Sequence, residues 1–193
     1  MKTSEKEELR SLFKLGNGSK KKHDFILNMV GRQLKESGEY LWINKNFSYP
    51  FQKDNNNGGE PGEVDILALR EDEVLEIYEI KSNPAAYGKG MGQLRKSFSW
   101  MEKNEKNVHK KIEEKIENGE SEEKLWYESE EKLKKHKKWF KEHDGYKGIE
   151  TILCYPIIDK SGIRIIYHEF NSYEDQDMKL KENQLHYFKN SQN

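Results

Sequence analysis

Residues 62–81, GEVDILALREDEVLEIYEIK, constrain the fold more than any other stretch of this chain. Two runs rich in apolar and β-branched residues, 63–70 and 74–81, are separated by a short polar break at 70–73. This pattern is typical of two strands joined by a tight turn. The chain is therefore predicted to contain an antiparallel β-hairpin with mostly apolar faces.

Three charged side chains fall at one end of this hairpin. Asp65 lies near the start of the first strand, and Glu79 and Lys81 lie at the end of the second. These ends are neighbours in an antiparallel pair, and alternation of side chains predicts that Asp65 shares a face with Leu67 and Leu69. Glu79 and Lys81 are likewise expected on one face of their strand. The two carboxylates and the ammonium group are thus expected to converge.

Carboxylates inside a sheet cost free energy unless they are paired or bind a metal. Two oxygen ligands suit Mg²⁺ or Mn²⁺, with waters completing the coordination. A neighbouring lysine can orient a water or stabilise charge on a phosphate. The pattern therefore predicts metal-assisted phosphodiester hydrolysis. The alternative is a surface pair of Glu79 and Lys81, which would contribute little in a chain that is 36% charged.

The residues after the hairpin extend the pattern. Pro84 ends the second strand, and a glycine-containing loop over 85–92 is predicted to lead into a helix that opens at Gln93. The motif residues in chain order are Gly62, Asp65, Glu79, Lys81 and Gln93.

This order resembles the PD-(D/E)xK nuclease superfamily, in particular its RecB-like and Holliday-junction-resolvase-like branches. Their pattern is Asp…(Asp/Glu)-x-Lys followed by Gln-x-x-x-Tyr, and Phe98 lies one residue beyond the place of that Tyr. The resemblance covers residues 20–101, with 149–170 as the remaining core. It implies an α/β restriction-endonuclease-like core, in which a mixed central β-sheet is flanked by helices.

The resemblance also implies roles for individual residues. Asp65, Glu79 and the backbone carbonyl of Ile80 would hold Mg²⁺, for which Mn²⁺ would substitute. Lys81 would position the attacking water, with support from Gln93.

The resemblance also implies an acid near the start of the first helix. Asp24 is the best-placed acid in the helix predicted over 24–37, and its alternative role is to charge the helix N-terminus. Glu63 shares the predicted face of Asp65 and is a further candidate ligand.

The remaining elements complete one nuclease-like domain over residues 1–193. Beyond those described above, the pattern predicts a strand at 40–49, a helix at 92–103, and a hairpin at 149–158 and 163–170. Residues 102–147 are dense in Lys and Glu and read as a charged helical hairpin, inserted into the domain or extending the preceding helix, and split at Asn118-Gly119.

The second arm of this insertion carries a cluster of basic residues. The lysines proposed to contact nucleic acid are Lys134, Lys135, Lys137 and Lys138. Lysines beside aromatic side chains suit phosphates and bases. The alternative is a solvated helix face.

Composition narrows the class of protein. The net charge of −1 and the pI of about 6.6 require that any contact with DNA use a local basic patch. The one cysteine, Cys154, lies in an apolar run and is expected to be a buried thiol. A single cysteine cannot form an intramolecular disulfide or a four-cysteine iron–sulfur site, and this fits a reducing compartment. With no apolar run of membrane length, a cytoplasmic protein is expected.

The expected function is a Mg²⁺-dependent deoxyribonuclease acting on DNA ends, single strands or branched DNA. The sequence leaves open whether it cuts as an exonuclease or an endonuclease, and as a monomer or a homodimer. The alternative is a non-catalytic module that binds nucleic acid or recruits a partner through the charged helices.

Overall fold

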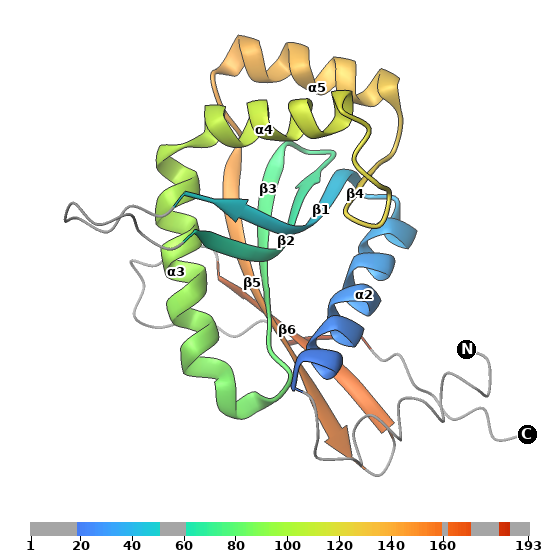
Figure 1. Ribbon diagram of the computed structural model, residues 1–193, viewed down its shortest axis with the longest axis vertical. Helices are drawn as coiled ribbons and strands as arrows, with labels where there is room; N and C mark the ends of the chain where they lie inside the picture. The colour runs from blue at the N-terminus through green and yellow to red at the C-terminus, as the bar shows by residue number, and fades with distance from the viewer. Residues whose placement is uncertain (1–18, 51–60, 160–161, 171–181, 186–193) are drawn as a thin grey trace, which may run out of the picture.

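The computed structural model describes residues 19–50, 61–159, 162–170 and 182–185. The protein is an α/β protein in which helices cover a mixed sheet (Figure 1). Six strands in the order β4-β1-β2-β3-β5-β6 form this sheet, and the short strand β7 extends it at one edge. The strands are β1 (Tyr40–Tyr49), β2 (Gly62–Arg70), β3 (Val74–Ile80), β4 (Leu125–Tyr127), β5 (Gly148–Asp159), β6 (Gly162–Phe170) and β7 (Glu182–Leu185).

The predicted hairpin is confirmed. Strands β2 and β3 pair antiparallel, with Leu67 opposite Ile77, and the polar break forms the turn, where Glu73 adopts a left-handed conformation with φ of 70°. The hairpin of β5 and β6 is also confirmed. Strand β3 pairs with β5 in parallel, which the sequence did not indicate. A parallel pair needs a long crossover, and here the helices between the two strands supply it.

Helices cover both faces of the sheet (Figure 1). Helix α2 (Ser19–Ser37) packs on one face against Ile66, Ala68 and Ile80. Helix α3 (Tyr87–Lys103) packs on the other face, where α4 (Glu105–Glu117) and α5 (Glu130–His143) extend the same core. In the described part of the chain, no helix combines the length and the apolar character that crossing a bilayer requires.

Two helices begin earlier than predicted. Helix α2 starts at Ser19, so the basic run Lys20–Lys22 forms its first turn. Helix α3 starts at Tyr87, directly after a 3-10 turn at Pro84–Ala86, so the loop predicted for 85–92 was wrong. Glycine usually disfavours a helix interior. Here Gly90 lets α3 approach the sheet: a Cβ at this position would lie 2.6 Å from Leu153 Cδ1.

The charged segment 102–147 forms two helices as predicted, with the break at Gly119, whose φ is +65°. No pattern in the sequence indicated the short strand β4 between them, which pairs with β1 at the edge of the sheet. The segment is therefore tied to the sheet at one edge.

Strand β1 contributes side chains to the cores on both faces of the sheet. Ile43 belongs to the core under α2, whereas Phe47 and Tyr49 belong to the core under α3. Strict alternation would place all three on one face. Asn46, with φ of 54°, interrupts the alternation, and asparagine tolerates this left-handed region better than most residues. The result is that Tyr49 reaches the α3 side.

The close approach at Gly90 predicts opposite effects for two glycine substitutions in α3. Gly90→Ala should lower the free energy of unfolding by about 1–3 kcal/mol, because the new methyl group would overlap the buried Leu153 side chain. Gly92→Ala, at a position where a Cβ would have nothing within 4 Å, should raise the free energy of unfolding by up to about 1 kcal/mol. Urea denaturation of both variants measures this, and equal effects would contradict the packing argument.

Candidate active site

Asp65 is fixed by two donors at the end of the hairpin. Its Oδ2 accepts a hydrogen bond of 2.6 Å from the backbone N–H of Ile80, and its Oδ1 lies 3.2 Å from Nε2 of His23 in α2. The residue is only 7% exposed. Figure 1 shows the end of β3 beside the first turn of α2, which is where these groups meet.

The predicted face of Asp65 was wrong. Leu67 and Leu69 belong to the core under α3, whereas Asp65 reaches His23 on the α2 side. Val64 also belongs to the α3 core, so alternation breaks at this point of β2. The partner strand β1 changes faces at the same level, because its Asn46 lies between the residues that pair with Val64 and Ile66.

Glu79 and Lys81 share a face as predicted. The Lys81 ammonium group donates to Oε1 of Glu79, which is only 2% exposed. The backbone N–H of Lys81 donates to the carbonyl of Cys154 at 2.8 Å and continues the pairing of β3 with β5. A Cβ at Gly90 would lie 3.1 Å from Lys81 Cε, so α3 confines the lysine side chain. Cys154 is a buried free thiol, as predicted.

The surroundings of Glu79 disfavour the charged form of its carboxyl group. Burial raises its pKa, the charge of Asp65 raises it further, and the ion pair with Lys81 only partly offsets both, so that the pKa is about 7. The effect of Asp65 means that the two carboxylates are close enough to repel each other. A cation bound between them would relieve this repulsion.

His23 is a site residue to which the sequence pattern assigns no role. Its hydrogen bond with Asp65 raises its pKa, against the effect of burial. Its Nδ1 lies 3.6 Å from Oδ1 of the half-exposed Asp24. Asp24 is thus brought to the edge of the site through His23. The adjacency of His23 and Asp24 in the sequence was the signal from which a role for His23 could have been predicted.

Gln93 lies on the face of α3 that faces the sheet, one turn after Gly90 and one turn before Ser97. Its buried Oε1 has no hydrogen-bond partner within the described residues. Ser97 occupies the place where the resemblance has Tyr, and its hydroxyl lies 3.0 Å from that of Tyr49. Burial raises the pKa of Tyr49, and the nearby charge of Glu79 adds to this. A tyrosine hydroxyl therefore reaches this region from β1.

The oxygen ligands at this site meet part of the coordination that a hard divalent cation requires. Asp65 and Glu79 supply two buried carboxylates, and Ile80 lies beside them, whereas Glu63 is exposed. Within the residues that the structure describes, no three or more His, Cys, Asp or Glu side chains are grouped so that they could hold a metal ion. Mg²⁺ usually keeps several waters and binds through one or two carboxylates plus substrate phosphates, so two acids are sufficient.

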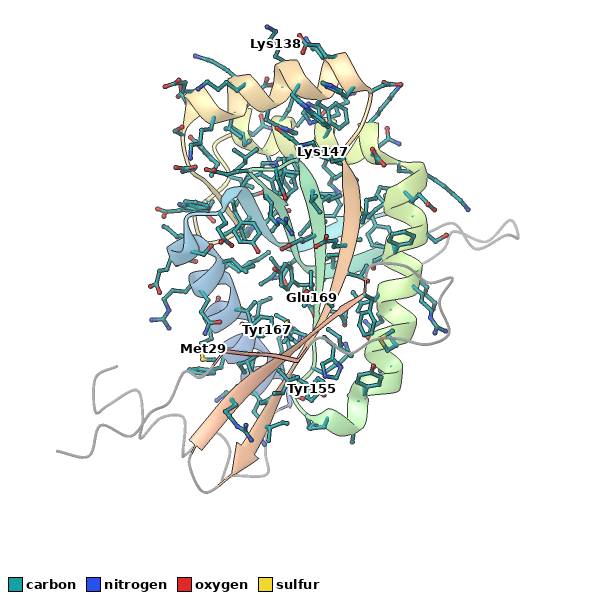
Figure 2. All side chains as sticks on the ribbon, turned by 180° about the vertical axis from the view of Figure 1, so that it is seen from behind. Met29, Lys138, Lys147, Tyr155, Tyr167 and Glu169 are labelled. Atoms are coloured by element: carbon teal, nitrogen blue, oxygen red, sulfur yellow. The ribbon has the colours of Figure 1, made fainter. Side chains whose placement is uncertain are left out.

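The four candidate nucleic-acid-binding lysines lie away from the acids. Helix α5 packs at the turn of the β2–β3 hairpin, where His136 contacts Glu73, whereas the acids are at the opposite end. Figure 2 shows Lys138 at the end of the molecule distant from Tyr155. The other three lysines, Lys134, Lys135 and Lys137, belong to the same helix.

Most of these lysines have acidic partners. Lys135 lies 3.1 Å from Glu131, Lys137 lies 2.7 Å from Glu113, and Lys138 lies 3.8 Å from Glu142. The exposed Lys134 projects from the same helix. The structure does not bring this cluster together with the acidic site, and its contact with nucleic acid stays a prediction.

No protein-family model matches this chain, and neither does any curated protein or solved structure with which it was compared.

The raised pKa of Glu79 predicts how stability depends on pH. The folded protein retains this proton up to about pH 7, whereas the unfolded chain releases it near 4.5, so stability falls as pH rises through this window. The loss due to Glu79 should reach about 3 kcal/mol. His23 acts in the same direction, because the stability that its raised pKa provides is lost as pH rises through that pKa.

Urea denaturation at pH 4.5 and pH 8 should therefore give a flatter profile for Glu79→Gln than for the parent protein. Glu114→Gln, on an exposed face of α4, is the matched control and should retain the parent slope. An unchanged slope in Glu79→Gln would contradict the burial of an ionisable carboxyl at this position.

Proposed function

We propose that this protein is a metal-dependent deoxyribonuclease that hydrolyses phosphodiester bonds at the end of the β2–β3 hairpin. The observation that carries the proposal is the buried Glu79 carboxylate, which is in contact with the Lys81 ammonium group and within electrostatic range of Asp65. A buried acid pair is costly for a purely structural site, and it is favourable for one that binds a cation.

Asp65 and Glu79 would hold Mg²⁺ or Mn²⁺, with the carbonyl of Ile80 as an additional ligand. When bound, the ion would lower the pKa of a water and screen the charge of a phosphate. This donor set agrees with the preference of such ions for oxygen ligands.

The chain's own groups would prepare the site for this chemistry. Lys81 holds Glu79 in place, and its ammonium group can donate a further hydrogen bond to a water or to a phosphate oxygen. The backbone N–H of Ile80 and the imidazole of His23 orient the Asp65 carboxylate. Gln93 would support Lys81, as the resemblance implies, and its buried Oε1 has no hydrogen-bond partner within the described residues. Asp24 would act through His23.

DNA ends, single strands or branched DNA are the proposed substrates. The basic run Lys20–Lys22 lies in the first turn of α2, immediately before His23, and Lys20 and Lys21 are exposed. Phosphate contacts at this run would bring the backbone of DNA to Asp65. This local patch supports a DNA substrate despite the overall charge of −1.

A non-catalytic module on the same fold is the second candidate. It is favoured by the lack of a group of three potential metal ligands among the described residues. It predicts DNA binding, in a gel-shift assay, that survives Asp65→Ala and yields no metal-dependent product.

The nuclease proposal predicts that Lys81→Ala reduces cleavage by a factor of about 100 or more, because it removes the ammonium group that contacts Glu79. The assay uses labelled single-stranded, duplex and junction DNA with Mg²⁺, Mn²⁺ or EDTA. Lys110→Ala, a highly exposed lysine of α4, is the matched control and should cut like the parent. Cleavage by Lys81→Ala at the parent rate would refute the assignment.

Metal binding itself is also testable without a substrate. Millimolar Mn²⁺ at pH 8 should raise the melting temperature of the parent, because a ligand that binds only the folded state stabilises it. Asp65→Asn should lose most of this shift, whereas Glu63→Gln, an exposed acid in the same strand, should keep it. A shift of equal size in Asp65→Asn would place the ion elsewhere.

A further inference from the structure

Helix α3 carries a row of lysines on the side that faces away from the sheet. Lys89, Lys96 and Lys103 are exposed and seven residues apart, so they follow one side of the helix with a drift of about 20° per step. At a rise of about 1.5 Å per residue, this α3 row is about 21 Å long. It lies opposite the residues that the helix buries, which are Gly90, Met91, Leu94, Ser97 and Met101.

The charge of α3 differs from that of the whole chain. The helix has four basic residues and one acid, which are Lys89, Arg95, Lys96, Lys103 and Glu102, whereas the chain has a net charge of −1. Glu102 lies about 100° around the helix from Lys103. Within the described residues, neither Lys89 nor Lys103 has an ion-pair partner. The α3 row therefore presents positive charge to solvent, whereas most of the α5 lysines lie beside acids.

The surface beside the α3 row is made of small residues. Gly88, Gly92 and Ser99 are exposed on the same side of the helix. A Cβ at Gly88 or at Gly92 would have nothing within 4 Å, so this side of α3 is open. No bulky side chain at these positions would keep a chain of phosphates from approaching the helix between the lysines.

The α3 row begins next to the proposed active site. A Cβ at Gly90 would lie 3.1 Å from Cε of Lys81, and Lys89 is the residue before it. Figure 1 shows α3 running from the end of β3, where the acids lie, along the sheet to α4. The basic run Lys20–Lys22 opens α2, which covers the other face of the sheet. A strand that crosses the acids would therefore meet lysines on both sides.

The straightness of the α3 row favours a single strand over a duplex. The phosphates of each strand of B-DNA wind around the axis of the duplex, so a straight row can follow one strand only over part of its length. A flexible single strand can lie along the whole row, as single strands do in the positively charged grooves that track their backbone.

We propose that the exposed side of α3 binds one strand of the DNA substrate, with phosphates at Lys89, Lys96 and Lys103. The choice of DNA rests on the proposed function, and the α3 row adds to it that a single strand is the form bound beside the acids. Contact with DNA is thereby assigned to α3 in place of α5.

The salt dependence of binding measures how many phosphates the lysines contact. Fluorescence anisotropy with labelled oligo(dT) of about 12 nucleotides, in EDTA, measures binding without cleavage. Each phosphate contact to a single strand contributes about 0.7 to the slope of log K against log salt concentration. The double variant Lys89→Gln with Lys103→Gln should therefore lower this slope by about 1.4. Lys110→Gln with Lys124→Gln, at two exposed lysines elsewhere, is the matched control and should keep the parent slope.

Several results would contradict a DNA-binding role for the α3 row. No binding of oligo(dT) at low salt, an unchanged slope in the α3 double variant, an equal loss of slope in the control, or tighter binding of a duplex of the same length would each overturn the proposal. Circular dichroism checks that the variants are folded. If the double variant does not fold, Lys89→Gln and Lys103→Gln should each alone lower the slope by about 0.7.

Binding in EDTA and cleavage with Mg²⁺ or Mn²⁺ are separate measurements, so this proposal and the nuclease proposal fail separately. Metal-dependent cleavage, together with an α3 double variant that keeps the parent slope, would overturn the role of α3 and leave the nuclease proposal intact. Salt-dependent binding through the α3 row without metal-dependent cleavage would support the role of α3 and refute the nuclease.

Discussion

One hydrogen bond between a side chain and the backbone determines the geometry of the proposed site. The pairing of β2 with β3 extends to Ile66 and Tyr78, and beyond it the Asp65 carboxylate accepts from the N–H of Ile80. A side chain thus continues the ladder where the backbone of β2 no longer does. Because the bond locks Asp65 onto the end of β3, Glu79 is held within range of its charge, and the electrostatics of both acids follow from this constraint.

Sequence patterns were sufficient for the elements whose residues alternate or repeat regularly. Strand β1 coincides with the predicted strand at 40–49, and the β2–β3 hairpin follows from two apolar runs around a polar break. Patterns failed where tertiary contacts override local preference. The glycine-rich start of α3 is helical because Gly90 packs against Leu153, and the three-residue strand β4 exists only through its pairing with β1. Neither contact leaves a local signal, since each joins segments far apart in the chain.

The sequence predicted which residues gather at the candidate site better than it predicted how they are arranged there. The motif pointed to Asp65, Glu79, Lys81 and Gln93, and the structure places all four around one end of the hairpin or on the adjoining face of α3. The prediction of the sheet face on which Asp65 lies was wrong, because strict alternation of side chains holds only in a regular strand. The sequence pattern assigned no role to His23 or Tyr49, because their proximity to the acids depends on how α2 and β1 pack against the sheet.

The left-handed residue in β1 has a broader consequence. By rotating the strand at Asn46, it lets a single strand contribute Ile43 to one core and Tyr49 to the other. The packing of both layers therefore depends on one backbone conformation, so a substitution at position 46 that disfavours the left-handed region would disturb both cores.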